Sequence, residues 1–136
     1  MAVLHVRDAQ KSSEFDCGVL DFREVSNLGG KTIFLQAADS TNDHDLGLFT
    51  LGSGAGDSGA GQTSVGLYHL AWEVDTFREL QRISERLQQV GALSGASDHG
   101  TTKALYARDP DGLEFEVSWV VRGSRISKSV QSVGVV

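Results

Sequence analysis

The sequence predicts an α+β fold in which one strand–helix–strands unit occurs twice. A glycine-rich stretch at residues 51–64 divides the 136-residue chain into halves of similar size. Each half opens with a short strand pattern, at 2–6 and 67–74, that is followed by an aspartate and then a helix pattern. Strands alternate their side chains with a period of two, whereas helices repeat every 3.6 residues. The succession of the two periods in both halves therefore indicates a repeated unit.

The second-half helix has the clearer pattern. Its apolar residues recur at spacings of three and four, and they are Phe77, Leu80, Ile83, Leu87 and Val90. Charged residues occupy the opposite face, which is typical of an amphipathic helix, and Asp75 is placed to be its N-cap. The first-half helix, 9–20 after Asp8, is weaker because Gly18 inside it costs about 1 kcal/mol relative to alanine.

Further strand patterns follow each helix, with turn residues between them. The strand patterns are 21–25, 31–37 and 44–51 in the first half and 101–108 and 113–120 in the second. Gly29-Gly30 and Asp109-Pro-Asp-Gly112 are turn signals, because proline pre-sets φ and glycine accepts positive φ. We therefore divide the chain into four parts. They are a first module (1–51), a flexible glycine-rich linker (52–65), a second module (66–121) and a C-terminal extension (122–136) that packs on a partner or frays.

Composition excludes several classes of function. With 40% hydrophobic and 22% charged residues, the chain is globular rather than disordered. A net charge of −6 argues against nucleic-acid binding, which depends on a basic surface. No apolar run approaches the roughly 20 residues that cross a bilayer, and the N-terminus does not resemble a signal peptide. The single cysteine, Cys17, cannot form an intrachain disulfide, and without an export signal we expect a cytoplasmic protein; we interpret Cys17 as an unreactive thiol.

Alternation assigns the strand residues of the second module to two faces. The bulky residues expected to cover the helix are Tyr68, Leu70, Trp72 and Val74 on one strand and Leu113, Phe115, Val117 and Trp119 on another. The opposite face then carries Leu67, His69, Ala71, Glu73, Glu114, Glu116 and Ser118, while Thr102, Ala104 and Tyr106 share a small polar face on the strand 101–108. Such a face either lines a cavity or meets water, and the spacing alone does not choose between these interpretations.

Several segments together resemble the vicinal oxygen chelate (glyoxalase/bleomycin resistance/dioxygenase) superfamily. In the second module they are GLYHLAWEV at 66–74, GASDHG at 95–100 and ALYARDPDGLEFEV at 104–117. In the first module, DHDLGLF at 43–49 is similar to the histidine-containing strand of the catechol 2,3-dioxygenase-like (extradiol) branch, and residues 6–22 fit the opening strand and helix. The resemblance covers about residues 1–120.

This resemblance implies two paired βαβββ modules that form an open, barrel-like mixed sheet around a metal cavity. In the extradiol branch, two histidines and one carboxylate hold Fe(II), or sometimes Mn(II) or another divalent metal, and leave positions for a catecholate and O₂. His69 and Glu116 match two of the ligands. His44 matches the acid–base histidine beside O₂, and His99 and Tyr106 match the pair that hydrogen-bonds the substrate oxygens.

The sequence departs from the family at the first ligand. Matching Val6 with Val74 places Met1 opposite His69, and a thioether is a weak ligand for Fe(II). Three explanations stay open: a different true start of the chain, a ligand from elsewhere such as the Met1 amine or a partner chain, or a relative without metal. His5 lies four residues further on, roughly 13 Å at the usual strand rise, and is interpreted as a rim or surface residue.

Two hypotheses about function follow from these observations. The first is a ring-cleaving dioxygenase that acts on a small catecholic or related aromatic substrate at Fe(II), impaired by Met1 at a ligand position. The second is a metal-free protein of the same fold that binds small molecules, like the resistance proteins of the superfamily. Glyoxalase or epimerase chemistry is less favoured, because those branches use a glutamate base. A homodimer is a further expectation, because paired-module proteins of this size often dimerise.

Overall fold

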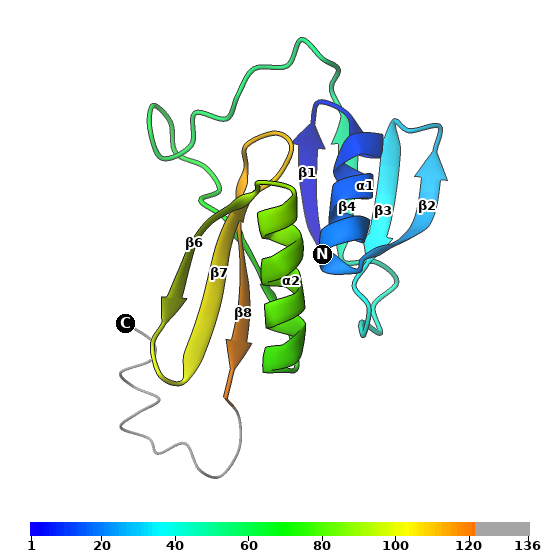
Figure 1. The fold of residues 1–136 in the computed structure, drawn as a ribbon. Coiled ribbons are helices and arrows are strands. Elements are labelled where there is room, and N and C mark those ends of the chain that lie inside the picture. The colour runs from blue at the N-terminus through cyan, green and yellow to red at the C-terminus, as the bar shows by residue number, and fades with distance from the viewer. Residues whose placement is uncertain (122–136) are drawn as a thin grey trace. The chain divides into compact units, whose positions relative to one another are not determined.

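A computed structural model of the protein describes residues 1–121 and divides them into two compact units (Figure 1). Unit 1 contains residues 1–59 and 109–113, and unit 2 contains residues 60–108 and 114–121. Each unit holds a four-stranded mixed sheet and one helix, so the predicted α+β fold of two βαβββ modules is confirmed. The predicted C-terminal extension, 122–136, lies outside the described residues.

Unit 1 places helix α1 against one face of its sheet. Its elements are β1 (Ala2–Val6), α1 (Ala9–Leu20), β2 (Arg23–Leu28), β3 (Thr32–Gln36) and β4 (Leu46–Thr50). The strand order is β1-β4-β3-β2, with β1 parallel to β4 and the other pairs antiparallel. The core lies between helix and sheet and contains Val6, Ala9, Val19, Phe22, Ile33, Leu35, Leu46 and Leu48.

Unit 2 repeats the same arrangement. Its elements are β5 (Leu70–Glu73), α2 (Phe77–Gln89), β6 (Leu93–Asp98), β7 (Thr102–Arg108) and β8 (Glu114–Val120). The strand order β5-β8-β7-β6 matches that of unit 1, again with a parallel first pair. Leu80, Ile83 and Leu87 form the buried stripe of α2 and face a core that includes Phe115 and Val117. The sequence pattern predicted these three residues, but Phe77 and Val90, at the two ends of the predicted stripe, are exposed.

The two helices start at different kinds of cap. Asp8 precedes α1, and its Oδ1 accepts hydrogen bonds from the backbone N–H groups of Gln10 and Lys11 at 3.0 and 3.3 Å. The N-cap of α2 is Thr76 rather than the predicted Asp75, since Thr76 Oγ1 accepts from the Glu79 N–H at 3.1 Å. Either side chain can accept such a bond, and the extended backbone at Thr76 decides which one does.

Two strands of unit 2 differ from their predictions. Strand β5 begins at Leu70 rather than at 67, and Tyr68 is 77% exposed, so the expectation that Tyr68 covers the helix was wrong. Strand β6, Leu93–Asp98, was not predicted, because its serine, glycine and alanine residues have low strand propensity. Pairing with β7 holds this edge strand in place.

The glycine-rich linker is fastened within unit 1 rather than free along its whole length. Arg7, at the end of β1, donates from Nε to the Ala55 carbonyl oxygen at 3.0 Å and forms an ion pair with Asp57. Its Nη1 also donates to Asp111 Oδ1 at 2.9 Å. One guanidinium therefore fixes two loops to the end of β1. Among residues 1–121, no helix is both long and apolar enough to cross a bilayer.

Candidate functional site

His69 and Glu116 converge on one face of the unit 2 sheet. His69 comes directly before β5, and β5 runs parallel to β8 with Leu70 beside Phe115 and Ala71 beside Glu116. This register brings His69 Nε2 to 3.2 Å from Glu116 Oε2. The imidazole is 23% exposed and the carboxylate 20%, so both groups are sheltered but reachable. Their role as metal ligands stays a prediction.

Glu114 lies on the other side of the same imidazole. It is two residues before Glu116, so its side chain falls on the same face of the sheet. Its Oε2 is 3.5 Å from His69 Nδ1. Both of these atoms are buried, and neither has a hydrogen-bond partner in this geometry. His69 is therefore flanked by a carboxylate at each ring nitrogen.

Tyr106 and Ser97 extend this polar face toward the edge of the sheet. Tyr106 on β7 is directly opposite Glu116 in the β7–β8 register, and directly paired residues share a face. Its phenol oxygen lies 3.4 Å from Ser97 Oγ on β6. A half-buried hydroxyl pair therefore stands beside the His69–Glu116 pair.

His99 lies at the opposite end of unit 2 from His69. It is exposed in the β6–β7 turn, where its backbone N–H donates to the Thr102 carbonyl oxygen at 2.9 Å. Thr102 pairs with Val120, whereas Glu114 stands at the far end of β8. The six residue steps from Glu114 to Val120 along β8 span about 20 Å at the usual strand rise. Unit 2 does not bring His99 to His69 and Glu116, and its predicted contact with substrate oxygens stays a prediction.

The other two histidines belong to unit 1. His44 comes shortly before β4, and its ring packs against Phe34 with the ring centroids 4.7 Å apart. Its predicted acid–base role stays a prediction. His5 is exposed on β1, and its ring makes an edge contact with the ring of Phe49 at a centroid distance of 6.3 Å, in agreement with its interpretation as a rim or surface residue.

Unit 1 has no counterpart of the His69–Glu116 pair. Ala2 pairs with Leu46, so Met1 stands level with Asp45, as His69 stands level with Glu114. In the same comparison Gly47 corresponds to Glu116, because Val3 lies beside Gly47 as Ala71 lies beside Glu116. Met1 is 68% exposed. The register therefore reproduces the superposition that placed a methionine at the first ligand position.

The His69–Glu116 pair suits two ligands of one divalent ion. Two bonds of about 2.1 Å from a shared metal leave nitrogen and oxygen donors roughly 3 Å apart when they are adjacent in its coordination shell. The observed distance of 3.2 Å meets this requirement. Within residues 1–121, no group of three or more histidine, cysteine, aspartate or glutamate side chains is arranged to hold a metal ion. The remaining ligands would have to be water or substrate oxygens, or come from elsewhere.

Sequence reasoning did not single out Glu114 or Ser97. Glu114 is two residues before Glu116, so the alternation placed it on the correct face, but it was given no role. Ser97 was missed together with β6. Half-buried and exposed residues alternate along Leu93–Asp98, which would have identified a strand. This alternation is a property of the folded sheet, and the residue types alone do not show it.

Comparisons with known proteins agree with this architecture. Residues 1–117 match the family described as the Glyoxalase/Bleomycin resistance protein/Dioxygenase superfamily. The chain is 31% identical over 117 residues to a catechol-2,3-dioxygenase of Bacillus subtilis (strain 168). This aligned region covers 85% of the chain and 39% of that protein. The chain therefore spans well under half the length of this relative.

Solved structures give the same result for the fold. A glyoxylase/bleomycin resistance protein/dioxygenase domain from Frankia sp. EAN1pec superposes with a TM-score of 0.70 at 26% identity, covering 90% of each chain. A variant of the fosfomycin resistance protein FosX from Listeria monocytogenes, complexed with Mn(II) and 1S,2S-dihydroxypropylphosphonic acid, has a TM-score of 0.62 at 21% identity and covers 85% of this chain and 84% of that one. Because residues 1–117 match the family model, the 136-residue chain itself belongs to the glyoxalase/bleomycin resistance protein/dioxygenase superfamily.

Proposed function

We propose that the protein is a metal-dependent, extradiol-type dioxygenase that cleaves the ring of a catecholic or related small aromatic substrate. The observation that carries this proposal is the approach of His69 Nε2 to Glu116 Oε2 at 3.2 Å, with Tyr106 beside Glu116 on the same face. The likeness to a catechol-2,3-dioxygenase supports it, although the chain corresponds to 39% of that protein.

His69, through Nε2, and Glu116, through its carboxylate, would hold the metal. We propose Fe(II), with Mn(II) as the alternative, because imidazole and carboxylate donors suit both ions. When bound, such an ion supplies a Lewis acid for the substrate oxygens and open positions for further ligands.

The protein's own side chains orient the substrate. The Tyr106 hydroxyl can donate a hydrogen bond to a substrate oxygen, while Ser97 Oγ, 3.4 Å away, restricts the position of the phenol oxygen. Glu116 keeps its carboxylate on the face that Tyr106 shares, so a substrate oxygen near one group is near the other. This arrangement favours a substrate with neighbouring oxygens over one with a single hydroxyl.

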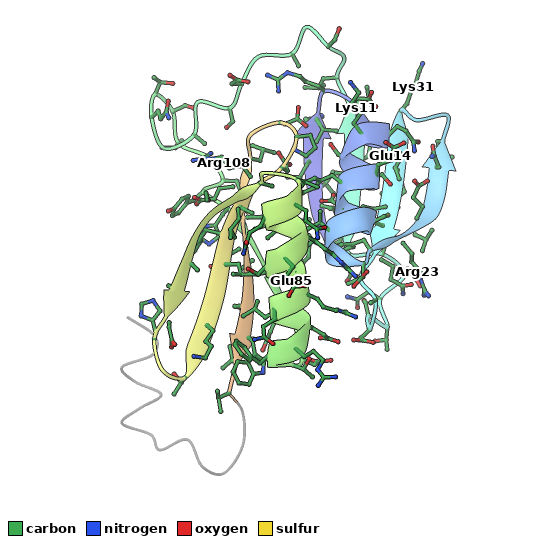
Figure 2. All side chains as sticks on the ribbon, in the orientation of Figure 1. Lys11, Glu14, Arg23, Lys31, Glu85 and Arg108 are labelled. Atoms are coloured by element: carbon green, nitrogen blue, oxygen red, sulfur yellow. The ribbon has the colours of Figure 1, made fainter. Side chains whose placement is uncertain are left out.

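The test is anaerobic loading with Fe(II), followed by a panel of catechols in air. The proposal predicts a yellow ring-opened product, and it predicts that His69→Ala and Glu116→Ala lose at least ten-fold in both iron content and rate. Glu85→Ala is the matched control, because Glu85 is an exposed carboxylate on α2 in the same unit (Figure 2). An absence of iron uptake together with an absence of colour across the panel would contradict the proposal.

A metal-free binding protein of the same fold is the second candidate. The observation that favours it is the presence of Met1 and Gly47 in unit 1 where unit 2 has His69 and Glu116. This alternative predicts a thermal shift with small aromatic ligands and none with Fe(II) or Mn(II). Stoichiometric metal in the wild-type protein that is lost in His69→Ala would exclude it.

A further inference from the structure

We infer that Glu114 is a positioning residue, whose carboxylate accepts the Nδ1–H of His69 and so directs the Nε2 lone pair toward the metal side of the ring. The inference rests on the proposed function and deepens it. Its basis is one distance and two buried atoms: Glu114 Oε2 lies 3.5 Å from His69 Nδ1, and both atoms are buried without a hydrogen-bond partner.

These two atoms satisfy each other if they move together by a few tenths of an ångström. A neutral imidazole has one N–H donor and one acceptor nitrogen, and a carboxylate only accepts. Buried polar atoms are almost always paired, because an unpaired one loses its hydrogen bonds to water without replacement. A hydrogen bond from Nδ1–H to Glu114 is the pairing within reach, and it leaves Nε2 as the acceptor.

Burial also decides which carboxylate faces the metal. Nδ1 is buried, so the 23% exposure of the His69 side chain comes from its other atoms. A catalytic metal keeps open positions for water or substrate, which a buried edge cannot provide. The metal therefore belongs at the Nε2–Glu116 side. Glu114 then takes the place of the outer carboxylate that commonly orients a metal-binding histidine.

A purely structural role is the alternative that the test must separate. Arg108 stands directly opposite Glu114 in the β7–β8 register, where opposite charges on neighbouring strands attract. If Glu114 served only this cross-strand pair, Arg108→Gln would have the same consequences as a change of Glu114. If Glu114 positions His69, only the change of Glu114 acts on the imidazole.

The first measurement is Mn(II) or Zn(II) affinity by competition with a chelating dye. We expect Glu114→Leu to weaken binding by about 10- to 100-fold, the usual effect of losing an outer-shell partner. Glu114→Gln keeps an oxygen that accepts from Nδ1–H and should recover part of this loss. Arg108→Gln and the exposed control Glu85→Ala should bind as the wild type does. Equal affinities for the wild type and Glu114→Leu would overturn the inference.

The second measurement needs no metal and separates the two claims. In Glu116→Ala, Nε2 has lost its neighbouring carboxylate, so ¹⁵N–¹H spectra at pH 8 should show His69 in the Nδ1–H tautomer. The double variant Glu116→Ala/Glu114→Leu should lose that preference. An Nε2–H tautomer in Glu116→Ala overturns the role of Glu114. A wild type that binds neither ion, with the Nδ1–H tautomer present, overturns the proposed metal site instead and leaves the His69–Glu114 pairing intact.

Discussion

Glu116 Oε2 lies 3.2 Å from His69 Nε2 although α2, β6 and β7 separate the two residues along the chain. The parallel pairing of β5 with β8 brings them together, since parallel neighbours require such a crossover connection. The same register fixes the face on which each side chain lies. A slip by one residue would turn Glu116 to the side of α2 and place Val117, which is buried, on the polar face.

Gly47 occupies the position in unit 1 that Glu116 has in unit 2, and a side chain there would crowd Phe34. A Cβ added there would lie 3.1 Å from Phe34 Cε1, and the rings of His44 and Phe49 limit how far Phe34 can move. We expect Gly47→Ala to lower the free energy of unfolding by about 1 kcal/mol, because overpacking outweighs the gain in strand propensity.

Gly18→Ala is the matched glycine control for that prediction. Gly18 is exposed within α1, with open space around the added carbon. We expect this change to raise the free energy of unfolding by about 0.5–1 kcal/mol through helix propensity alone. Urea denaturation of the two variants should give opposite signs, and a stabilising Gly47→Ala would show that Phe34 yields freely.

Asp16 should make the protein less stable as the pH rises from acid to neutral. It is buried on α1, and burial, followed by the negative charge of Asp109, raises its pKa to about 7. Because this carboxyl binds its proton more tightly in the folded state than in the unfolded state, its favourable contribution is complete below pH 4. The contribution is lost as the pH rises to about 7, and the upper limit of the loss is about 4 kcal/mol.

Asp16→Asn removes this titration while keeping the shape of the side chain. We expect the variant to gain stability over the wild type between pH 5 and pH 8 in urea denaturation, with the gain levelling off above pH 7. Glu14→Gln, an exposed change on the same helix, serves as the control. A difference between Asp16→Asn and the wild type that stays constant with pH would refute the assignment.

Arg7→Ala should release the first part of the linker. Arg7 holds the Ala55 carbonyl oxygen, Asp57 and Asp111, and these two aspartates raise the pKa of its guanidinium. Without the guanidinium, the backbone of residues 53–59 should exchange its amide hydrogens faster, as measured by mass spectrometry. Lys11→Ala, a change to an exposed cation in the same unit, should leave exchange in this segment unaltered. Unchanged exchange in Arg7→Ala would mean that other contacts hold the linker.

Local signals were sufficient for the elements that depend on their own residues. The bounds of α1 agree with the predicted 9–20, because Asp8 caps its start and Asp21 ends it in a left-handed conformation. Strand β6 depends on β7 instead, so its weak composition concealed it. The choice of Thr76 over Asp75 as N-cap likewise depends on backbone geometry that a list of residues does not contain.

The part of the candidate site that could be predicted is the face of the sheet on which each residue lies, because side chains alternate between the two faces along a strand. Alternation placed His69, Glu114 and Glu116 on one face, and the register of β5 with β8 turned that face into a cluster. The alternation of side chains does not show how far along the sheet two residues on the same face lie from each other. His99 resembles a site residue by its motif, yet the β6–β7 turn places it at the other end of the sheet.

The central claim is that a divalent ion binds between His69 Nε2 and Glu116. The most direct measurement is an anomalous difference map from crystals loaded with Mn(II). The account predicts one strong peak about 2.1–2.2 Å from both His69 Nε2 and a Glu116 oxygen, and no such peak in crystals of His69→Ala. A peak at the Nδ1–Glu114 side of the ring, or no peak near His69 in fully loaded crystals, would contradict it.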